Sequence, residues 1–191
     1  MPTAQPAFPA AAPPVTTARL ELWLPHPDDL DDLVTMLAGD GMTRYLGPAR
    51  AERQPQFDRL LRNGGSWALF NTGLFHVRKR GERPVIGTCG VFRSLRGFGK
   101  GMDEVPEAGW IIRQDCWGQG FAAEAMAAAL AWFDAAHGPG RVVCMIEQGN
   151  TASHRLAARL GFVRYDSHIA EDDGTVLELF ERNSPSRTEY Q

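Results

Sequence analysis

A glycine-bracketed turn in the second half of the chain constrains the fold more than any other feature. Residues 117–120 (Trp-Gly-Gln-Gly) lead directly into an alanine-rich run that ends at Ala136, so we predict a turn followed by a helix. The residues from Glu107 to Ile112 predict a strand before the turn, and those from Arg141 to Ile146 predict a buried strand after the helix. The turn therefore lies inside a strand–helix–strand unit.

The backbone of such a turn is suited to hold phosphate. Few side chains shield its N–H groups, which lie at the positive end of the helix dipole. The alternative is that the glycines start the helix for steric reasons alone. The sequence has no Gly-x-x-x-x-Gly-Lys-Ser/Thr motif, and the turn lacks the third glycine of a dinucleotide-binding fingerprint. Nucleoside triphosphates and NAD are therefore disfavoured as ligands.

Composition narrows the class of protein further. The 191 residues, 43% of them hydrophobic, predict a single α/β domain with a substantial core. A net charge of −3 disfavours a nucleic-acid or anionic-membrane partner. Three cysteines (Cys89, Cys116 and Cys144) make no Cys-x-x-Cys pair, which favours a reducing cytoplasm over a disulfide framework. No apolar run approaches the length of a membrane-spanning helix, so we expect a soluble protein.

Hydrophobic periodicity divides the rest of the chain. We expect residues 1–18 to be a Pro/Ala-rich N-terminal tail, residues 19–182 a single domain, and residues 183–191 a polar C-terminal tail. Further strands are predicted over residues 19–24, 66–70, 74–79, 85–92, 162–165 and 175–180. Further helices are predicted from Pro27 to near Gly39 or Gly41, from Glu52 to Leu61 with a stop at Gly64-Gly65, and from Thr151 to Leu160.

A second motif lies about 30 residues after the turn. It reads Asn150-x-x-Ser153-x-Arg155-Leu156-x-x-Arg159-Leu160-Gly161-Phe162. Together with the turn at residues 117–122, this motif resembles the Gcn5-related N-acetyltransferase (GNAT) family, and more narrowly its RimJ/RimL-like branch. The resemblance covers roughly residues 17–182. Trp117 departs from the Arg or Gln that the general family has at this position, but an aromatic residue is common there in the branch.

The resemblance implies both a fold and a cofactor. The fold would be an α/β (α+β) structure, with a mixed, mostly antiparallel, twisted central sheet, a splayed parallel strand pair and flanking helices. The cosubstrate would be acetyl-coenzyme A, with no metal. Its expected binding residues are Ile111, Ile112, Arg113, Gly118, Gln119, Gly120, Phe121, Ala122, Asn150 and Ser153. Asn150 could equally be a helix N-cap, and Arg113, Arg155 or Arg159 could pair with phosphates or be solvated.

In this family an amine attacks the thioester directly, so no covalent enzyme intermediate is needed. The resemblance implies that the backbone N–H of Ile112 meets the oxyanion. The tyrosine that many members use to protonate the leaving thiolate is missing, because Ala157 stands in its place; Ser153 is the predicted donor, with Tyr165 as a weaker substitute. Glu107 is the predicted base acting through water, although a solvated glutamate at a strand end is an alternative.

Other groups could also serve as the base. Glu147 and the acidic cluster Glu171-Asp172-Asp173 are expected on the side where the acceptor would enter. The expected acceptor is a protein or peptide α-amino group. The chain itself is expected to be a monomer or a homodimer. A small-molecule amine is the enzymatic alternative, and a non-catalytic acetyl-coenzyme A sensor is the alternative from another class.

Overall fold

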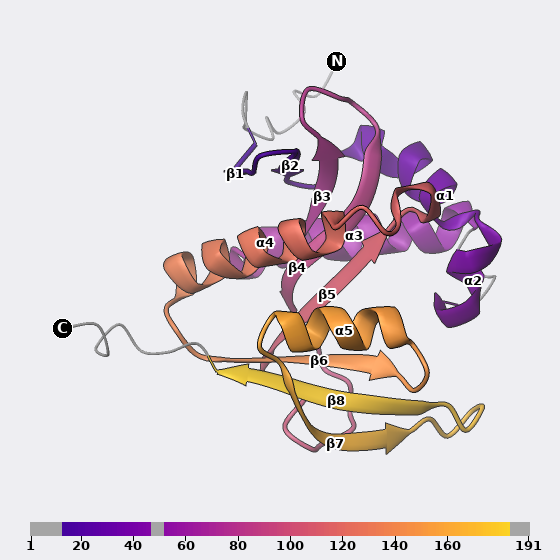
Figure 1. Ribbon diagram of the computed structural model, residues 1–191, viewed down its shortest axis with the longest axis vertical. Coiled ribbons are helices and arrows are strands. Elements are labelled where there is room, and N and C mark those ends of the chain that lie inside the picture. The colour runs from indigo at the N-terminus through magenta and orange to yellow at the C-terminus, as the bar shows by residue number, and fades with distance from the viewer. Residues whose placement is uncertain (1–12, 47–51, 184–191) are drawn as a thin grey trace, which may run out of the picture.

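The computed structural model describes residues 13–46 and 52–183. They form one eight-stranded sheet with the strand order β1-β2-β3-β4-β5-β6-β8-β7 (Figure 1). Every neighbouring pair is antiparallel except β5 and β6, which are parallel. The predicted mixed, mostly antiparallel sheet is therefore confirmed. The strands are β1 (Val15–Thr16), β2 (Leu20–Trp23), β3 (Leu74–Lys79), β4 (Val85–Arg93), β5 (Pro106–Ile112), β6 (Arg141–Glu147), β7 (Val163–Ile169) and β8 (Val176–Asn183).

Helices cover both faces of this sheet. Figure 1 shows α4 and α5 in front of the strands, and α1 and α3 behind them. The front helices are α4 (Phe121–His137) and α5 (Thr151–Arg159), and the others are α1 (Leu30–Leu37), α2 (Asp40–Leu46) and α3 (Arg53–Phe70). Two 3-10 turns, η1 (Pro27–Asp29) and η3 (Gln114–Cys116), precede α1 and α4. Because β4 has a helix on each face, seven consecutive residues of it are buried.

The main core lies between α4 and the sheet. The helix buries a stripe at helical spacing, formed by Phe121, Ala125, Met126, Ala129, Leu130 and Phe133. Ala122 is half-buried against this core. A second cluster on the other face joins α1, α3 and the start of β4. The predicted helix after the turn is thus confirmed, and its buried stripe fixes where the glycine turn before it points.

The predicted helix stop at Gly64-Gly65 and the predicted strand over residues 66–70 are wrong. Helix α3 continues through both glycines to Phe70. It does so because Trp67 packs against Phe75 and Trp132, with ring centroids 4.8 and 5.3 Å away. The helix ends at Asn71, whose φ of 50° is the left-handed cap.

Smaller corrections concern element boundaries. Strand β1 pairs with β2 inside the segment predicted as tail, so the folded chain begins before residue 19. The helix predicted from Pro27 is divided into η1 and α1, whereas α2 follows its predicted end near Gly39 or Gly41 and was not predicted. Strand β7 extends to Ile169, four residues beyond the predicted end, because it pairs with β8 along its length. Residues 1–12 and 184–191 of the two predicted tails lie outside the described residues.

Candidate active site

Strands β5 and β6 diverge and leave an opening between them. Their pairing is limited to Glu107 with Val143, near the start of both strands, and beyond this point β5 turns away from β6 (Figure 1). Because the strands are parallel, the opening faces the turns that follow their carboxyl ends. These are the glycine turn before α4 and the turn before α5. The splayed parallel pair is therefore present, as predicted.

The register of β5 shows which of its backbone groups face the opening. The N–H of Arg113 donates to the carbonyl of Ile86 on β4, at 2.8 Å. Since hydrogen-bonded and non-hydrogen-bonded pairs alternate in an antiparallel ladder, Ile111 also turns its N–H towards β4. Trp110 and Ile112 turn theirs the other way, into the opening. The predicted oxyanion donor Ile112 thus has the right orientation, whereas the backbone N–H groups of Ile111 and Arg113 face away.

The glycine turn presents bare backbone at the start of α4. Gly118 and Gly120 have φ values of 72° and 79°, which other residues adopt only with strain. Gly120 is the N-cap, and no described side chain caps the helix. The first helical hydrogen bond is donated by Glu124 to the Gly120 carbonyl, so the N–H groups of residues 121–123 have no partner within the helix. An added Cβ at Gly118 would meet nothing within 4 Å. The turn therefore fits an anion such as a pyrophosphate.

Arg19 supports this turn from the side of β2, a role that the sequence analysis did not assign. Its guanidinium pairs with Glu124 at 2.6 Å, donates to the Gln119 carbonyl at 2.9 Å, and lies 4.6 Å from the centre of the Phe121 ring. Burial raises the pKa of Glu124, but hydrogen bonds from Thr17 and Arg19 outweigh it and lower the pKa overall.

Ser153 lies at the opening, at the start of α5. Asn150 caps this helix by accepting a hydrogen bond from the Ser153 N–H at 3.1 Å. The Ser153 hydroxyl accepts a hydrogen bond from the indole N–H of Trp110 on β5, at 3.3 Å. A hydroxyl that accepts from one partner still has its own proton to donate. The Asn150 carboxamide likewise keeps its NH₂ group, so capping does not exhaust its donors.

Glu107 is buried, so the alternative of a solvated strand-end glutamate is wrong. Its exposed fraction is 3%. One carboxylate oxygen is 2.6 Å from the Arg96 guanidinium, and the other accepts from Ser94 at 2.5 Å and from Arg96 at 2.9 Å. Glu107 therefore joins the loop after β4 to the part of β5 that is still paired with β6. These contacts favour a structural role over that of a base.

The remaining predicted residues are more dispersed. The Arg113 side chain pairs with Asp115 at 2.7 Å, and Arg155 and Arg159 are exposed. Tyr165 lies in the small cluster around Met102, Val143 and Leu179, where its hydroxyl is buried.

Cys89 and Cys144 are buried in the core, and burial raises the pKa of both thiols. In the described part of the chain, no group of three or more His, Cys, Asp or Glu side chains is placed to hold a metal ion.

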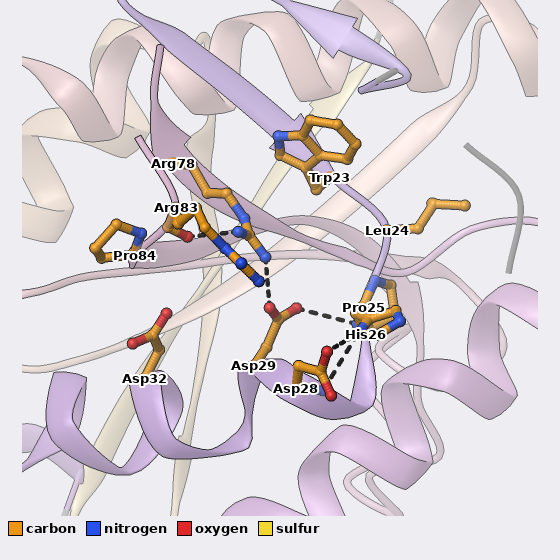
Figure 2. A pocket seen from close by; sticks show the side chains of 10 residues that line it. All are labelled: Trp23, Leu24, Pro25, His26, Asp28, Asp29, Asp32, Arg78, Arg83 and Pro84. Atoms are coloured by element: carbon orange, nitrogen blue, oxygen red, sulfur yellow. Dashed lines mark hydrogen bonds and ion pairs between the residues drawn. The ribbon is translucent and has the colours of Figure 1, made fainter. Parts of the chain in front are cut away.

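A separate hollow of about 510 Å³ lies beside η1 and the end of β2 (Figure 2). Asp29 is at its base, where its carboxylate is 2.5 Å from Arg78 and 2.5 Å from His76. None of the predicted site residues lines it. We therefore assign it no part in cofactor binding.

Among the described helices, none is both long and apolar enough to cross a membrane.

Comparison with known proteins agrees with this geometry. The model of the acetyltransferase (GNAT) domain matches residues 19–163. The uncharacterized N-acetyltransferase YoaA of Bacillus subtilis (strain 168) is 26% identical over 151 residues, which are 78% of this chain and 82% of that protein.

Solved structures of similar fold include a Bordetella pertussis protein assigned to the GNAT family. It is 32% identical, has a TM-score of 0.76, and is matched over 88% of this chain and 98% of its own. The ribosomal-protein-S5-alanine acetyltransferase of Vibrio fischeri has a TM-score of 0.71 at 16% identity, over 88% of this chain and 95% of its own. With the family model covering most of the described domain, this chain belongs to the GNAT family of acetyltransferases.

Proposed function

We propose that this protein transfers the acetyl group of acetyl-coenzyme A to the α-amino group of a protein or peptide. The observation that carries the proposal is the opening between β5 and β6, with a bare glycine turn at one side and the start of α5 at the other. The S5-alanine acetyltransferase named above supports a protein N-terminus as the acceptor, as does the RimJ/RimL-like second motif. Three free, buried cysteines suit a reducing cytoplasm.

The groups around the opening would divide the work among them. The N–H groups of residues 121–123, which lack helical partners, and the dipole of α4 would hold the pyrophosphate. The cosubstrate supplies a thioester whose carbonyl carbon the amine attacks. The N–H of Ile112 would stabilise the negative charge that develops on the carbonyl oxygen, because it points into the opening without a strand partner. The Ser153 hydroxyl would donate its proton to the leaving thiolate, and the proton that the amine releases would restore the hydroxyl.

Binding of acetyl-coenzyme A tests the cofactor site. We expect the substitution Gly120→Glu to abolish calorimetrically measured binding, because its carboxylate would face the phosphates and its side chain would occupy the turn. Gly138→Glu is the matched control: Gly138 caps the other end of α4, also has a positive φ (84°), and has open space around it. Equal loss of binding in both variants would mean that backbone strain, and not loss of the phosphate-binding turn, is responsible.

Turnover tests Ser153. We expect Ser153→Ala to lower kcat by about 10- to 100-fold, within the range of general acid catalysis, while the affinity for acetyl-coenzyme A changes little. Ser167→Ala, on β7, is the control. An unchanged kcat in Ser153→Ala would remove the serine from the mechanism.

A panel of acceptors tests the substrate class. Peptides with free α-amino groups should be acetylated faster than the same peptides with blocked N-termini and a free lysine. Faster acetylation of a polyamine or an amino acid would favour the small-molecule alternative. Acetyl-coenzyme A binding without turnover of any amine would instead support the sensor.

A further inference from the structure

The diverging strands β5 and β6 form the two arms of the splay, and helix α2 bridges them. At one arm, the N–H of Gly41 donates to the side-chain oxygen of Gln114, just beyond β5, at 3.0 Å. At the other arm, the hydroxyl of Tyr45 donates to the carbonyl of Gly149, just beyond β6, at 3.1 Å. Figure 1 shows α2 on the side to which β5 and β6 both point. The helix therefore spans the open end of the site.

Trp117 lies where this bridge meets the glycine turn. Its indole N–H donates to the carbonyl of Ile112 at 2.6 Å. The far edge of its ring lies against Gly41, since a Cβ added there would be only 2.9 Å from Trp117 Cη2 and 2.9 Å from Gln114 Cδ. Although the side chain is 49% exposed, it therefore has close contacts at both ends. Position 117 is also where this chain departs from the general motif.

We propose that Trp117 is a positioning residue that seats α2 on the glycine turn and fixes the peptide of Ile112, and thereby controls how the acceptor amine reaches the thioester. The inference rests on the proposed function. By engaging the Ile112 carbonyl, the indole leaves the N–H as the one backbone group that this residue presents to the opening. By filling the space under Gly41, the ring sets the height of α2 above the opening. Trp117 acts through these two neighbours and need not touch the reacting atoms.

Two substitutions separate the two contacts. Gly41→Ala adds a methyl group where α2 contacts the Trp117 ring. Because the φ of Gly41 is not positive, the substitution adds no backbone strain. Trp117→Phe removes the N–H and the outer part of the ring. We expect Gly41→Ala to raise the acceptor KM about tenfold, and Trp117→Phe to lower kcat about tenfold, as displacements of well under 1 Å from productive geometry can do. Neither should change the Kd of acetyl-coenzyme A more than about twofold.

The double variant provides the decisive comparison. A methyl group at position 41 would contact both Trp117 and Gln114, and Trp117→Phe removes only the first of these contacts. The Gly41→Ala change should therefore cost less acceptor affinity when it is added to Trp117→Phe than when it is made in the wild type. If the two changes in acceptor KM are simply additive, the proposed contact between Trp117 and Gly41 is overturned. Gly64→Ala on α3 is the control, because its methyl would meet nothing within 4 Å.

Hydrogen exchange gives a readout that needs no acceptor. The amides of residues 40–46 should exchange about tenfold faster in Trp117→Phe and in Gly41→Ala than in the wild type, while α3 exchanges unchanged. Unchanged exchange at residues 40–46 in both variants would overturn the inference even if the enzyme is active. Failure of the wild type to bind acetyl-coenzyme A would instead refute the proposed function, so the two failures are distinguishable.

Discussion

At the scale of single residues, contacts rather than position along a strand decide which carboxylate is free to act. Glu107 is near the start of β5, where the resemblance places a base, but Arg96 and Ser94 occupy both of its oxygens. Glu124, one turn into α4, has its charge balanced by Arg19. Glu147 ends β6 and is half-buried, and it stays a candidate base.

The buried contacts of Glu107 lead to a prediction about stability. Glu107→Gln should lower the free energy of unfolding by about 2 kcal/mol, because it leaves a partly buried Arg96 without its anionic partner. Chemical denaturation measures this, with the exposed Glu82→Gln as control. A variant that keeps its stability but loses kcat would return Glu107 to the role of base.

At the scale of secondary-structure elements, α3 shows how tertiary packing overrides a local signal. Two adjacent glycines usually weaken a helix, and here the helix passes through them. Trp67, three residues after Gly64, is anchored between Phe75 and Trp132, and its indole N–H donates to the Leu74 carbonyl at 3.1 Å. That anchoring offsets the glycine penalty.

The glycines of α3 also give an engineering prediction. Gly64→Ala and Gly65→Ala should each raise the free energy of unfolding by about 1 kcal/mol, since both positions are helical and neither Cβ would meet an atom within 4 Å. Thermal or denaturant unfolding measures the gain. Gly73→Ala is the contrasting variant: its Cβ would come within 2.6 Å of the Trp67 indole, so it should destabilise. Destabilisation by both helix substitutions would mean that α3 is interrupted after all.

At the scale of the whole molecule, ion pairs join segments that are far apart in sequence. Asp29 in η1 binds His76 and Arg78 on β3, and its exposed fraction is 2%. Figure 2 shows its ion pair with Arg78. Burial raises the pKa of Asp29, but the hydrogen bond and charge of His76 and the charge of Arg78 outweigh it, so that the pKa lies below its ordinary value of 3.8. The cluster fixes η1, and with it the start of α1, to the sheet.

This lowered pKa predicts how acid affects stability. A carboxylate with a depressed folded-state pKa stabilises the fold above its unfolded-state pKa, and this contribution is lost as the pH falls below 3.8 towards the folded-state value. Asp29→Asn should cost about 3 kcal/mol at neutral pH, because His76 and Arg78 lose a buried partner. It should also flatten the acid limb of the stability curve, measured by denaturation at several pH values. Parallel acid limbs for Asp29→Asn and wild type would contradict the linkage.

The sequence by itself determined the strand–helix–strand unit, the glycine turn and the cap of α5. These are local features: glycines with positive φ, an amphipathic stripe and an asparagine three residues before Ser153 act over a few residues. The continuous α3 was beyond local reasoning, because Trp67 is held in part by Trp132, which lies far along the chain.

Only the tertiary structure decided which groups meet at the opening. The alternation of hydrogen bonds between β4 and β5 turns the backbone N–H of Ile112, and not that of Ile111, towards the opening. Arg19 reaches Glu124 across 105 residues, and Gly41 reaches Gln114 across 73. Contacts at such separations leave no periodic trace in a single sequence, because each depends on how the sheet and its helices pack. The glycine turn could therefore be predicted from the sequence, whereas its supports and the bridge over the opening could not.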